Sequence, residues 1–172
     1  MIIYFSGGKD SLAVLHLHKD DPDLESVYFG DTGDIYPHIM EFVVSTCRTF
    51  NVPLEIVKAK MSQEEYHGKF GYPSDMVPVT RSPEAKHGRK NGGEQKIQSY
   101  IQCCSNMCWL PMQEKAMGKT VYRGIKKCDE YDTVANGFFD ESSGIKYINP
   151  IWDWTDDMVF DYLKRNNVEV AR

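Results

Sequence analysis

The residues whose types and spacing could do chemistry begin near the N-terminus, in the run Ser6-Gly7-Gly8-Lys9-Asp10-Ser11. Apolar residues at 2–5 predict a buried strand before this run, and the apolar pattern at 12–17 predicts a helix after it. Glycines let backbone N–H groups approach an oxyanion closely, and a helix N-terminus adds partial positive charge. Lys9 supplies a full charge, and two serine hydroxyls supply further donors. We interpret residues 6–11, called the glycine loop below, as a nucleotide-phosphate site; the alternative is an ordinary glycine turn.

The spacing of the glycine loop excludes two commoner phosphate-binding motifs. A Walker loop needs four residues between its first glycine and the Gly-Lys pair, and a dinucleotide fingerprint needs G-x-G-x-x-G. Gly7, Gly8 and Lys9 are consecutive, so neither pattern fits. The loop therefore indicates another kind of nucleotide site.

The cysteines are the second group of chemically active side chains. The five are Cys47, Cys103, Cys104, Cys108 and Cys128. An odd number, with no secretory signal at the start, argues against a disulfide framework. Their clustering between 103 and 108 indicates metal or redox chemistry; the alternative is thiols buried on a packed helix.

Residues 61–101 are rich in glycine and proline and show no sustained apolar period, so we expect a long irregular segment there. Its centre has an excess of positive charge in an otherwise acidic chain. The basic side chains that stand out are Arg81, Lys86, Arg89 and Lys90. They favour a lid that closes over an anionic substrate. The alternative is a solvated, partly disordered loop.

Strand and helix patterns alternate along the rest of the chain. Apolar runs predict five strands, at 2–5, 26–30, 54–58, 119–123 and 145–148. Helical patterns lie at 12–18, 37–50, 104–118 and after Thr155, which is suited to cap the last helix. This alternation predicts an α/β fold, a doubly wound parallel sheet of about five strands in a three-layer arrangement. We expect a single nucleotide-binding domain over 1–172.

Composition bounds the class of protein. The chain has 172 residues, of which 26% are charged and 41% hydrophobic, as in ordinary globular proteins. A net charge of −5 argues against a general nucleic-acid coat, so a nucleic-acid partner is less favoured. Met1 leads directly into the first strand and no apolar run approaches a membrane span, so we expect a cytoplasmic protein without a membrane partner.

Four segments together resemble the phosphoadenosine phosphosulfate (PAPS) reductase family. This family is a branch of the PP-loop ATP pyrophosphatases, which have the adenine nucleotide alpha-hydrolase-like fold. The segments are the glycine loop; Phe29-Gly30-Asp31-Thr32-Gly33 with Tyr36-Pro37; Gly124-Ile125-Lys126-Lys127; and Asn149-Pro150 with Trp154-Thr155. They occur in the family's order and span most of the chain, which makes the match more specific than the loop alone.

The resemblance implies an adenine nucleotide lying across the strand ends. The implied nucleotide and phosphate contacts are Ser6, Gly7, Gly8, Lys9, Asp10, Ser11, Asp31, Thr32, Gly33, Arg123 and Gly124, and the implied catalytic residues are Lys9, Asp10 and Lys126. For Asp10 we favour capping of the helix or a role linked to Mg²⁺, because a carboxylate repels phosphates. Asp31 has a similar choice between ribose, metal and loop contacts; the alternative is an ordinary turn residue.

One departure from the family concerns an arginine. Lys126 stands where the family often has the arginine of Gly-x-Arg, and lysine lacks the planar fork that grips an oxyanion through two bonds. Arg123 could substitute for it, or its strand position could point it elsewhere.

A second departure concerns the cysteines. Cys103-Cys104 lies where many family members have a pair that ligates an iron–sulfur cluster. The second pair of those members is absent, which leaves Cys108 and Cys128 as candidate ligands that could complete an iron–sulfur or zinc site.

The resemblance leaves three functions open. A sulfonucleotide reductase would use adenylyl sulfate or PAPS, with a redox partner. An ATP-cleaving enzyme would adenylate a small anionic substrate and release pyrophosphate, as the small subunit of ATP sulfurylase or a nucleic-acid sulfur-modifying enzyme would. A nucleotide-binding module would need a missing subunit for its chemistry. The Cys103-Cys104 pair favours the reductase, whereas the end of the chain at Arg172, without the cysteine-bearing tail of many reductases, favours ATP cleavage.

Overall fold

The computed structural model describes residues 1–74, 97–129 and 136–171. Within these ranges the main sheet has six strands in the order β3-β2-β1-β6-β8-β7. The parallel strands are β1 (Ile2–Tyr4), β2 (Ser26–Asp31), β3 (Leu54–Lys58), β6 (Thr120–Tyr122) and β8 (Ile145–Ile148). They confirm the predicted doubly wound parallel sheet. The short edge strand β7 (Phe139–Asp140), which the apolar pattern does not predict, pairs antiparallel with β8.

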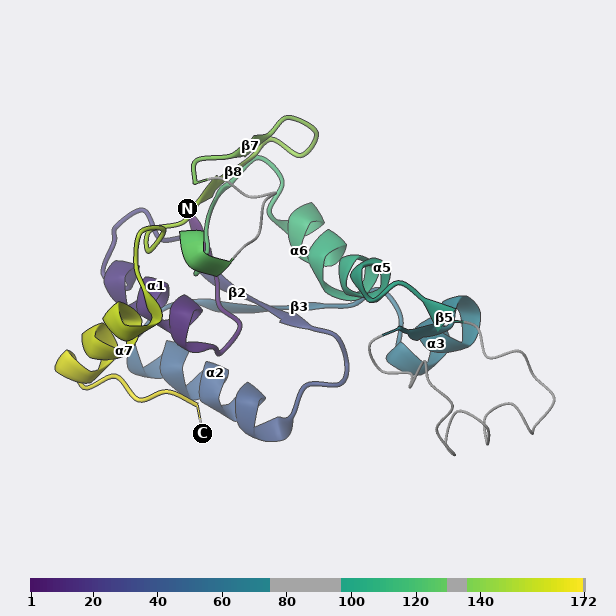
Figure 1. Ribbon diagram of the computed structural model, residues 1–172, viewed down its shortest axis with the longest axis horizontal. Helices are drawn as coiled ribbons and strands as arrows, with labels where there is room; N and C mark the ends of the chain where they lie inside the picture. The colour runs from purple at the N-terminus through teal and green to yellow at the C-terminus, as the bar shows by residue number, and fades with distance from the viewer. Residues whose placement is uncertain (75–96, 130–135, 172) are drawn as a thin grey trace.

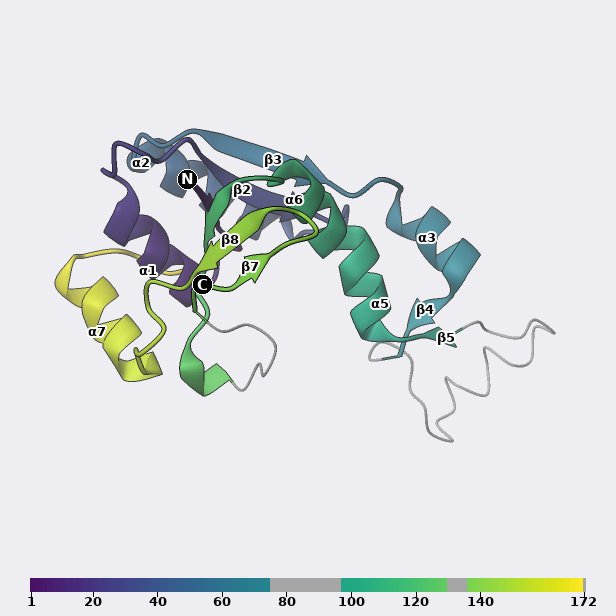
Figure 2. The ribbon, with the colours of Figure 1, turned by 90° about the horizontal axis from the view of Figure 1, so that it is seen from above.

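Helices cover both faces of this sheet, which confirms the predicted three layers (Figure 1 and Figure 2). One face carries α1 (Lys9–His18), α2 (Pro37–Thr49) and α7 (Asp156–Arg165), which share one hydrophobic core with the sheet. The other face carries α6 (Leu110–Lys115), whose Met112 packs in a second core. The strands are apolar on both sides because each side is covered, as in β1, where neither Ile2 nor Ile3 is exposed.

The helical stretch that ends in α6 begins earlier than predicted. Helix α5 (Tyr100–Cys104) leads into a π-helical turn, η1 (Ser105–Trp109), and then into α6. Pro111 lies one residue into α6 and has no N–H to donate to the preceding turn, which is where a helix tends to widen. No helix in the described ranges is long and apolar enough to span a membrane.

The prediction of an irregular segment over 61–101 is wrong for part of its length. Residues 63–70 form helix α3 (Gln63–Phe70), and β4 (Tyr72–Pro73) pairs in parallel with β5 (Ile97–Gln98). The helix starts at a capping box in which Ser62 and Glu65 exchange hydrogen bonds. The four basic residues assigned to a lid, Arg81, Lys86, Arg89 and Lys90, lie outside the described residues.

The order of the strands fixes where a ligand can bind. The chain builds outward from β1 through β2 to β3, and then returns to the other side of β1 with β6. The crossovers on the two sides of β1 run over opposite faces of the sheet, so the connections diverge at the carboxyl ends of β1 and β6. Open α/β sheets bind ligands at such a switch point. The glycine loop follows β1 there, and residues 123–126 follow β6.

Candidate functional site

The glycine loop is closed by its own serines. Gly7 has φ of 83°, a left-handed backbone that a residue with a side chain rarely adopts. The Ser11 hydroxyl donates to the Gly8 carbonyl at 3.0 Å and accepts from the Ser6 N–H at 3.2 Å. Ser11 therefore holds the turn together, whereas Ser6 and Gly8 are exposed at its surface.

Gly124 holds the end of β6 against this loop. A Cβ atom at Gly124 would lie 2.5 Å from the backbone of both Asp10 and Ser11, so only glycine fits without a shift of main chain. This close approach brings Lys126 to the start of α1, where its ammonium group donates to Asp10 Oδ1 at 2.8 Å. The structure thus brings together the three predicted catalytic residues, Lys9, Asp10 and Lys126.

Two lysines and three aspartates form one charged network beside the loop. Lys9 Nζ lies 2.8 Å from Asp10 Oδ2 and 2.9 Å from Asp156 Oδ1. Lys126, whose side chain is only 2% exposed, also contacts Asp129 Oδ1 at 3.1 Å and Asp156 Oδ1 at 3.3 Å. We call Lys9, Asp10, Lys126, Asp129 and Asp156 the lysine–aspartate network.

The network keeps both lysines charged. Burial by itself lowers the pKa of Lys126, but hydrogen bonds to Asp10 and Asp129 outweigh it and raise that pKa above its ordinary value. The same balance, with hydrogen bonds to Asp10 and Asp156, raises the pKa of Lys9. Hydrogen bonds from Lys9 and then Lys126 lower the pKa of Asp156. The site therefore presents two fixed ammonium groups at neutral pH.

The prediction that Asp10 caps the helix is wrong. Gly8 is the N-cap residue of α1, and no side chain in the described ranges makes the capping hydrogen bond. Both Asp10 oxygens instead accept bonds from ammonium groups, which are stronger partners than backbone N–H groups. Neither Asp129 nor Asp156 was among the predicted site residues. The partners of Asp156, Lys9 and Lys126, lie in distant segments, whereas Asp129 contacts Lys126 only three residues away and was missed although it is close in the sequence.

Arg123 points away from this network. The register of β6 places Val121 and Arg123 on the α6 face, where the guanidinium carbon lies 4.0 Å from the centroid of the Tyr147 ring. Burial lowers the pKa of Arg123 to about 10, so it remains charged at neutral pH. Of the two alternatives for this arginine, the structure supports the one in which its strand position points it elsewhere.

The segment after β2 makes a loop contact. Asp31 Oδ1 accepts a hydrogen bond from the Gly33 N–H at 2.8 Å, and Gly33 has φ of 86°. Thr32 lies between them in a tight turn that Asp31 stabilises. Of the roles considered for Asp31, the loop contact is therefore the one present here.

The predicted four-cysteine ligand set is not assembled. Cys103 packs with Tyr66 and Met107, Cys108 faces the sheet beside Gly30, and Cys128 lies in the 3-10 helix η2 (Lys127–Asp129). Among the described residues, no three His, Cys, Asp or Glu side chains are grouped to hold a metal ion. The thiols as placed therefore do not fit an iron–sulfur or zinc site. The carboxylates nearest the loop contact ammonium groups here, and a role of Asp10 linked to Mg²⁺ stays a prediction.

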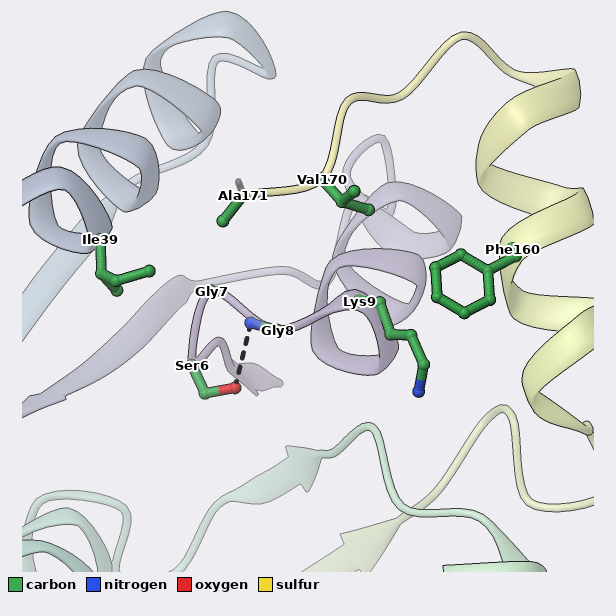
Figure 3. Close-up of a pocket in the computed structure, with 8 residues that line it drawn as sticks. All are labelled: Ser6, Gly7, Gly8, Lys9, Ile39, Phe160, Val170 and Ala171. Atoms are coloured by element: carbon green, nitrogen blue, oxygen red, sulfur yellow. Dashed lines mark hydrogen bonds between the residues drawn. The ribbon is translucent and has the colours of Figure 1, made fainter.

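A pocket opens over the glycine loop (Figure 3). Its volume is about 540 Å³, which is in the range of small-ligand sites. Loop residues 6–9 form its polar floor, and Ile39, Phe160, Val170 and Ala171 form an apolar wall. Lys9 projects past Phe160, with Nζ 5.7 Å from the ring centroid. The wall residues come from α2, α7 and the C-terminal segment, so the loop motif alone did not reveal them.

Comparisons with known proteins agree with this geometry. The sequence model of the phosphoadenosine phosphosulfate reductase domain matches residues 1–172. A search of curated proteins finds no match. The PAPS reductase of Candida auris, solved as a phosphate complex, has a TM-score of 0.63 at 21% identity, covering 98% of this chain and 74% of that chain.

The FMN adenylyltransferase of Candida glabrata, in complex with FAD and inorganic pyrophosphate, has a TM-score of 0.57 at 14% identity. The alignment covers 99% of this chain and 50% of the adenylyltransferase. At these identities the two structures share a fold with this chain, and the likeness shows the fold alone.

Proposed function

This chain belongs to the phosphoadenosine phosphosulfate reductase family, and we propose that it binds and reduces a sulfonucleotide, an adenine nucleotide that carries a sulfate group. The observation that carries the proposal is the pocket over the glycine loop, which Lys9 lines, together with the ammonium group of Lys126, which shares Asp10 with that of Lys9. Exposed loop backbone and two fixed cations suit the phosphosulfate group. The apolar wall, which includes Ile39 and Phe160, suits the rest of the nucleotide.

In the proposed reaction, a thiolate attacks the sulfur atom of the nucleotide's sulfate. The S–O bond to the phosphate breaks, and the nucleoside phosphate leaves with the bonding electron pair. A second thiolate then attacks the S-sulfonate, which gives a disulfide and sulfite. Lys9 and Lys126 would stabilise the negative charge that grows on the departing phosphate.

The thiols of this reaction come from a separate dithiol reductant in our proposal. The described residues that line the pocket include no cysteine. Cys128 is exposed and lies next to Asp129 of the network, but its Sγ is directed to the Trp154 carbonyl at 3.8 Å. A redox partner is therefore part of the proposed activity.

The second candidate is ATP cleavage, in which a substrate oxyanion attacks the α-phosphate of ATP and pyrophosphate leaves. The observation in its favour is the fold shared with an adenylyltransferase that holds FAD and inorganic pyrophosphate. In this chain the glycine loop and Lys9 would bind the leaving pyrophosphate.

One set of incubations tests both candidates. Purified protein is given adenylyl sulfate, PAPS or ATP, each with and without a dithiol, and binding, sulfite and pyrophosphate are measured. Dithiol-dependent sulfite from a sulfonucleotide supports the proposal, and pyrophosphate from ATP supports the second candidate. Binding without turnover would identify a nucleotide-binding module, and the absence of binding to all three would refute the nucleotide site.

Matched lysine variants connect any activity to the network. Lys9→Ala and Lys126→Ala remove its two cations, whereas Lys127→Ala removes an exposed lysine next in sequence to Lys126. The proposal requires that the first two variants lose nucleotide binding and that the third keeps it.

A further inference from the structure

Buried polar atoms without partners gather at one place, at the carboxyl ends of β6 and β8. In the part of the chain that the structure describes, the buried side-chain nitrogens and oxygens without a hydrogen-bond partner are Arg123 Nε and Nη2 and Asn149 Nδ2 and Oδ1. All four belong to two residues. Such atoms are rare in native proteins, and each one calls for a partner such as a water, an ion or a ligand.

The two residues are neighbours across the sheet. Tyr122 pairs with Ile148 in the parallel register of β6 and β8, and the Arg123 N–H donates to the Ile148 carbonyl at 2.9 Å. Arg123 and Asn149 therefore occupy the next register position on adjacent strands. Strand alternation from Val121 and Tyr147 directs both side chains to the α6 face.

The free atoms of Arg123 have the geometry of an oxyanion grip. Nε and Nη2 are the two donors on one edge of the guanidinium, and together they can bind two oxygens of one sulfate, phosphate or carboxylate group. The Tyr147 ring, 4.0 Å from the guanidinium carbon, stacks on the flat face of the guanidinium. The N–H groups lie in the guanidinium plane, so this stacking does not block them. Asn149, which is 0% exposed, adds an amide donor beside this edge.

The charge of Arg123 also lacks compensation. Within the described ranges it has no carboxylate partner. The titratable groups that act on it are Tyr147 and Tyr4, and burial raises the pKa of both, so they are neutral at neutral pH. The Tyr4 hydroxyl already donates to the Met112 carbonyl at 3.0 Å. A water molecule could accept a hydrogen bond here, but only an anion would also balance the charge.

We infer that Arg123 and Asn149 form an oxyanion subsite, separate from the glycine loop, that binds a tetrahedral sulfate or phosphate group. Arg123 as a whole is partly exposed, whereas its Nε and Nη2 atoms are buried. Gly124, the next residue, packs on Asp10 and Ser11, so the backbone that carries Arg123 adjoins the glycine loop. The group is either a free anion or part of the nucleotide, and the second source rests on the proposed function.

Calorimetric titration with sodium sulfate at constant ionic strength tests the subsite directly. Arg123→Gln removes both charge and fork, Arg123→Lys keeps the charge, and Arg165→Gln on the exposed face of α7 is the control. We expect sulfate to bind about tenfold more weakly to Arg123→Gln, with Arg123→Lys intermediate and the control unchanged. Circular dichroism and urea unfolding of each variant show that it is folded, and Asn149→Asp, which adds a repelling charge, provides an independent weakening variant.

Lys9→Gln separates the subsite from the loop. Free sulfate should still bind this variant through Arg123, whereas pyrophosphate should bind Arg123→Gln through the loop. Adenylyl sulfate and PAPS, titrated into the same variants, show whether the group belongs to the nucleotide.

The outcomes for the subsite and for the proposed function differ. If nucleotide binding is weakened by Lys9→Gln but not by Arg123→Gln, and sulfate binds equally to wild type and Arg123→Gln, the subsite is refuted and the proposed function stands. If sulfate depends on Arg123 but no nucleotide binds, the subsite stands and the proposed function is refuted. If sulfate binds neither wild type nor variants, and no nucleotide depends on Arg123, a structural water is the partner and the inference is wrong.

Discussion

Asp156 Oδ1 lies 2.9 Å from Lys9 Nζ, although the two residues are 147 positions apart. The contact ties the first turn of α7 to the first turn of α1, directly beside the pocket. The same oxygen lies 3.3 Å from Lys126 Nζ, so one carboxylate bridges both ammonium groups. A phosphate or sulfate that binds these lysines must therefore compete with Asp156.

The first prediction is that Asp156→Asn strengthens anion binding. Removing the carboxylate charge frees the hydrogen-bonding capacity of Lys9 and Lys126, and we expect pyrophosphate to bind about fivefold more tightly. Isothermal titration calorimetry at neutral pH measures the change. Asp157→Asn is the control, because it lies in the same helical turn and is exposed. Equal or weaker binding by Asp156→Asn alone would show that the carboxylate assists the ligand rather than competing with it.

The second prediction concerns the buried ammonium group of Lys126. Lys126→Met removes the cation that three aspartates share, and the remaining carboxylates then repel one another. We expect the free energy of unfolding at pH 7 to fall by about 3 kcal/mol, the scale for breaking a buried ion pair. Urea denaturation followed by circular dichroism measures it. Lys127→Met should change stability little, and an equal loss in both variants would mean that the network adds no stability.

The third prediction rests on the close approach of Gly124 to the loop. Gly124→Ala puts a Cβ atom 2.5 Å from backbone atoms of Asp10 and Ser11, so the loop or the β6 end must move. We expect weaker nucleotide binding and a loss of about 1–3 kcal/mol in unfolding free energy. Gly68→Ala is the control, because a Cβ at this helical position meets open space. Unchanged binding by Gly124→Ala would show that the site tolerates displacement of this segment.

The sequence predicts the parallel sheet well because its strands are buried on both faces. Runs such as residues 2–5 and 26–30 have to be apolar throughout, and the glycine turn after residue 5 marks the start of a helix. Gly124 packs on the loop backbone, and its assignment to the nucleotide site stays a prediction. These features depend on local composition, which a single sequence displays.

Two of the features missed from the sequence are a site residue that depends on contacts between distant segments and a helix whose local signals are weak. Asp156 reaches Lys9 only because α7 packs beside α1. Helix α3 is polar, with Tyr66 and His67 as its buried residues, so the Ser62–Glu65 capping box was its main cue. The direction of Arg123, in contrast, could have been settled in advance, because strand alternation puts it on the same face as Val121.

The last prediction concerns acid stability at the edge of the sheet. The hydroxyls of Ser143 and Ser142 donate to Asp140 and lower the pKa of its carboxyl from 3.8 to about 2. A carboxyl whose pKa is lower in the folded state stabilises the protein above its unfolded pKa, and this contribution is lost as the pH falls through the folded pKa. The free energy of unfolding of the wild type should therefore fall between about pH 4 and pH 2, in part because Asp140 becomes protonated. In Asp140→Asn this part of the fall should be missing. Urea midpoints measured from pH 6 to pH 2 test this, with Glu141→Gln, an exposed neighbour, as the control. Parallel pH profiles of wild type and Asp140→Asn would mean that the Ser142 and Ser143 hydrogen bonds do not favour the ionised carboxylate.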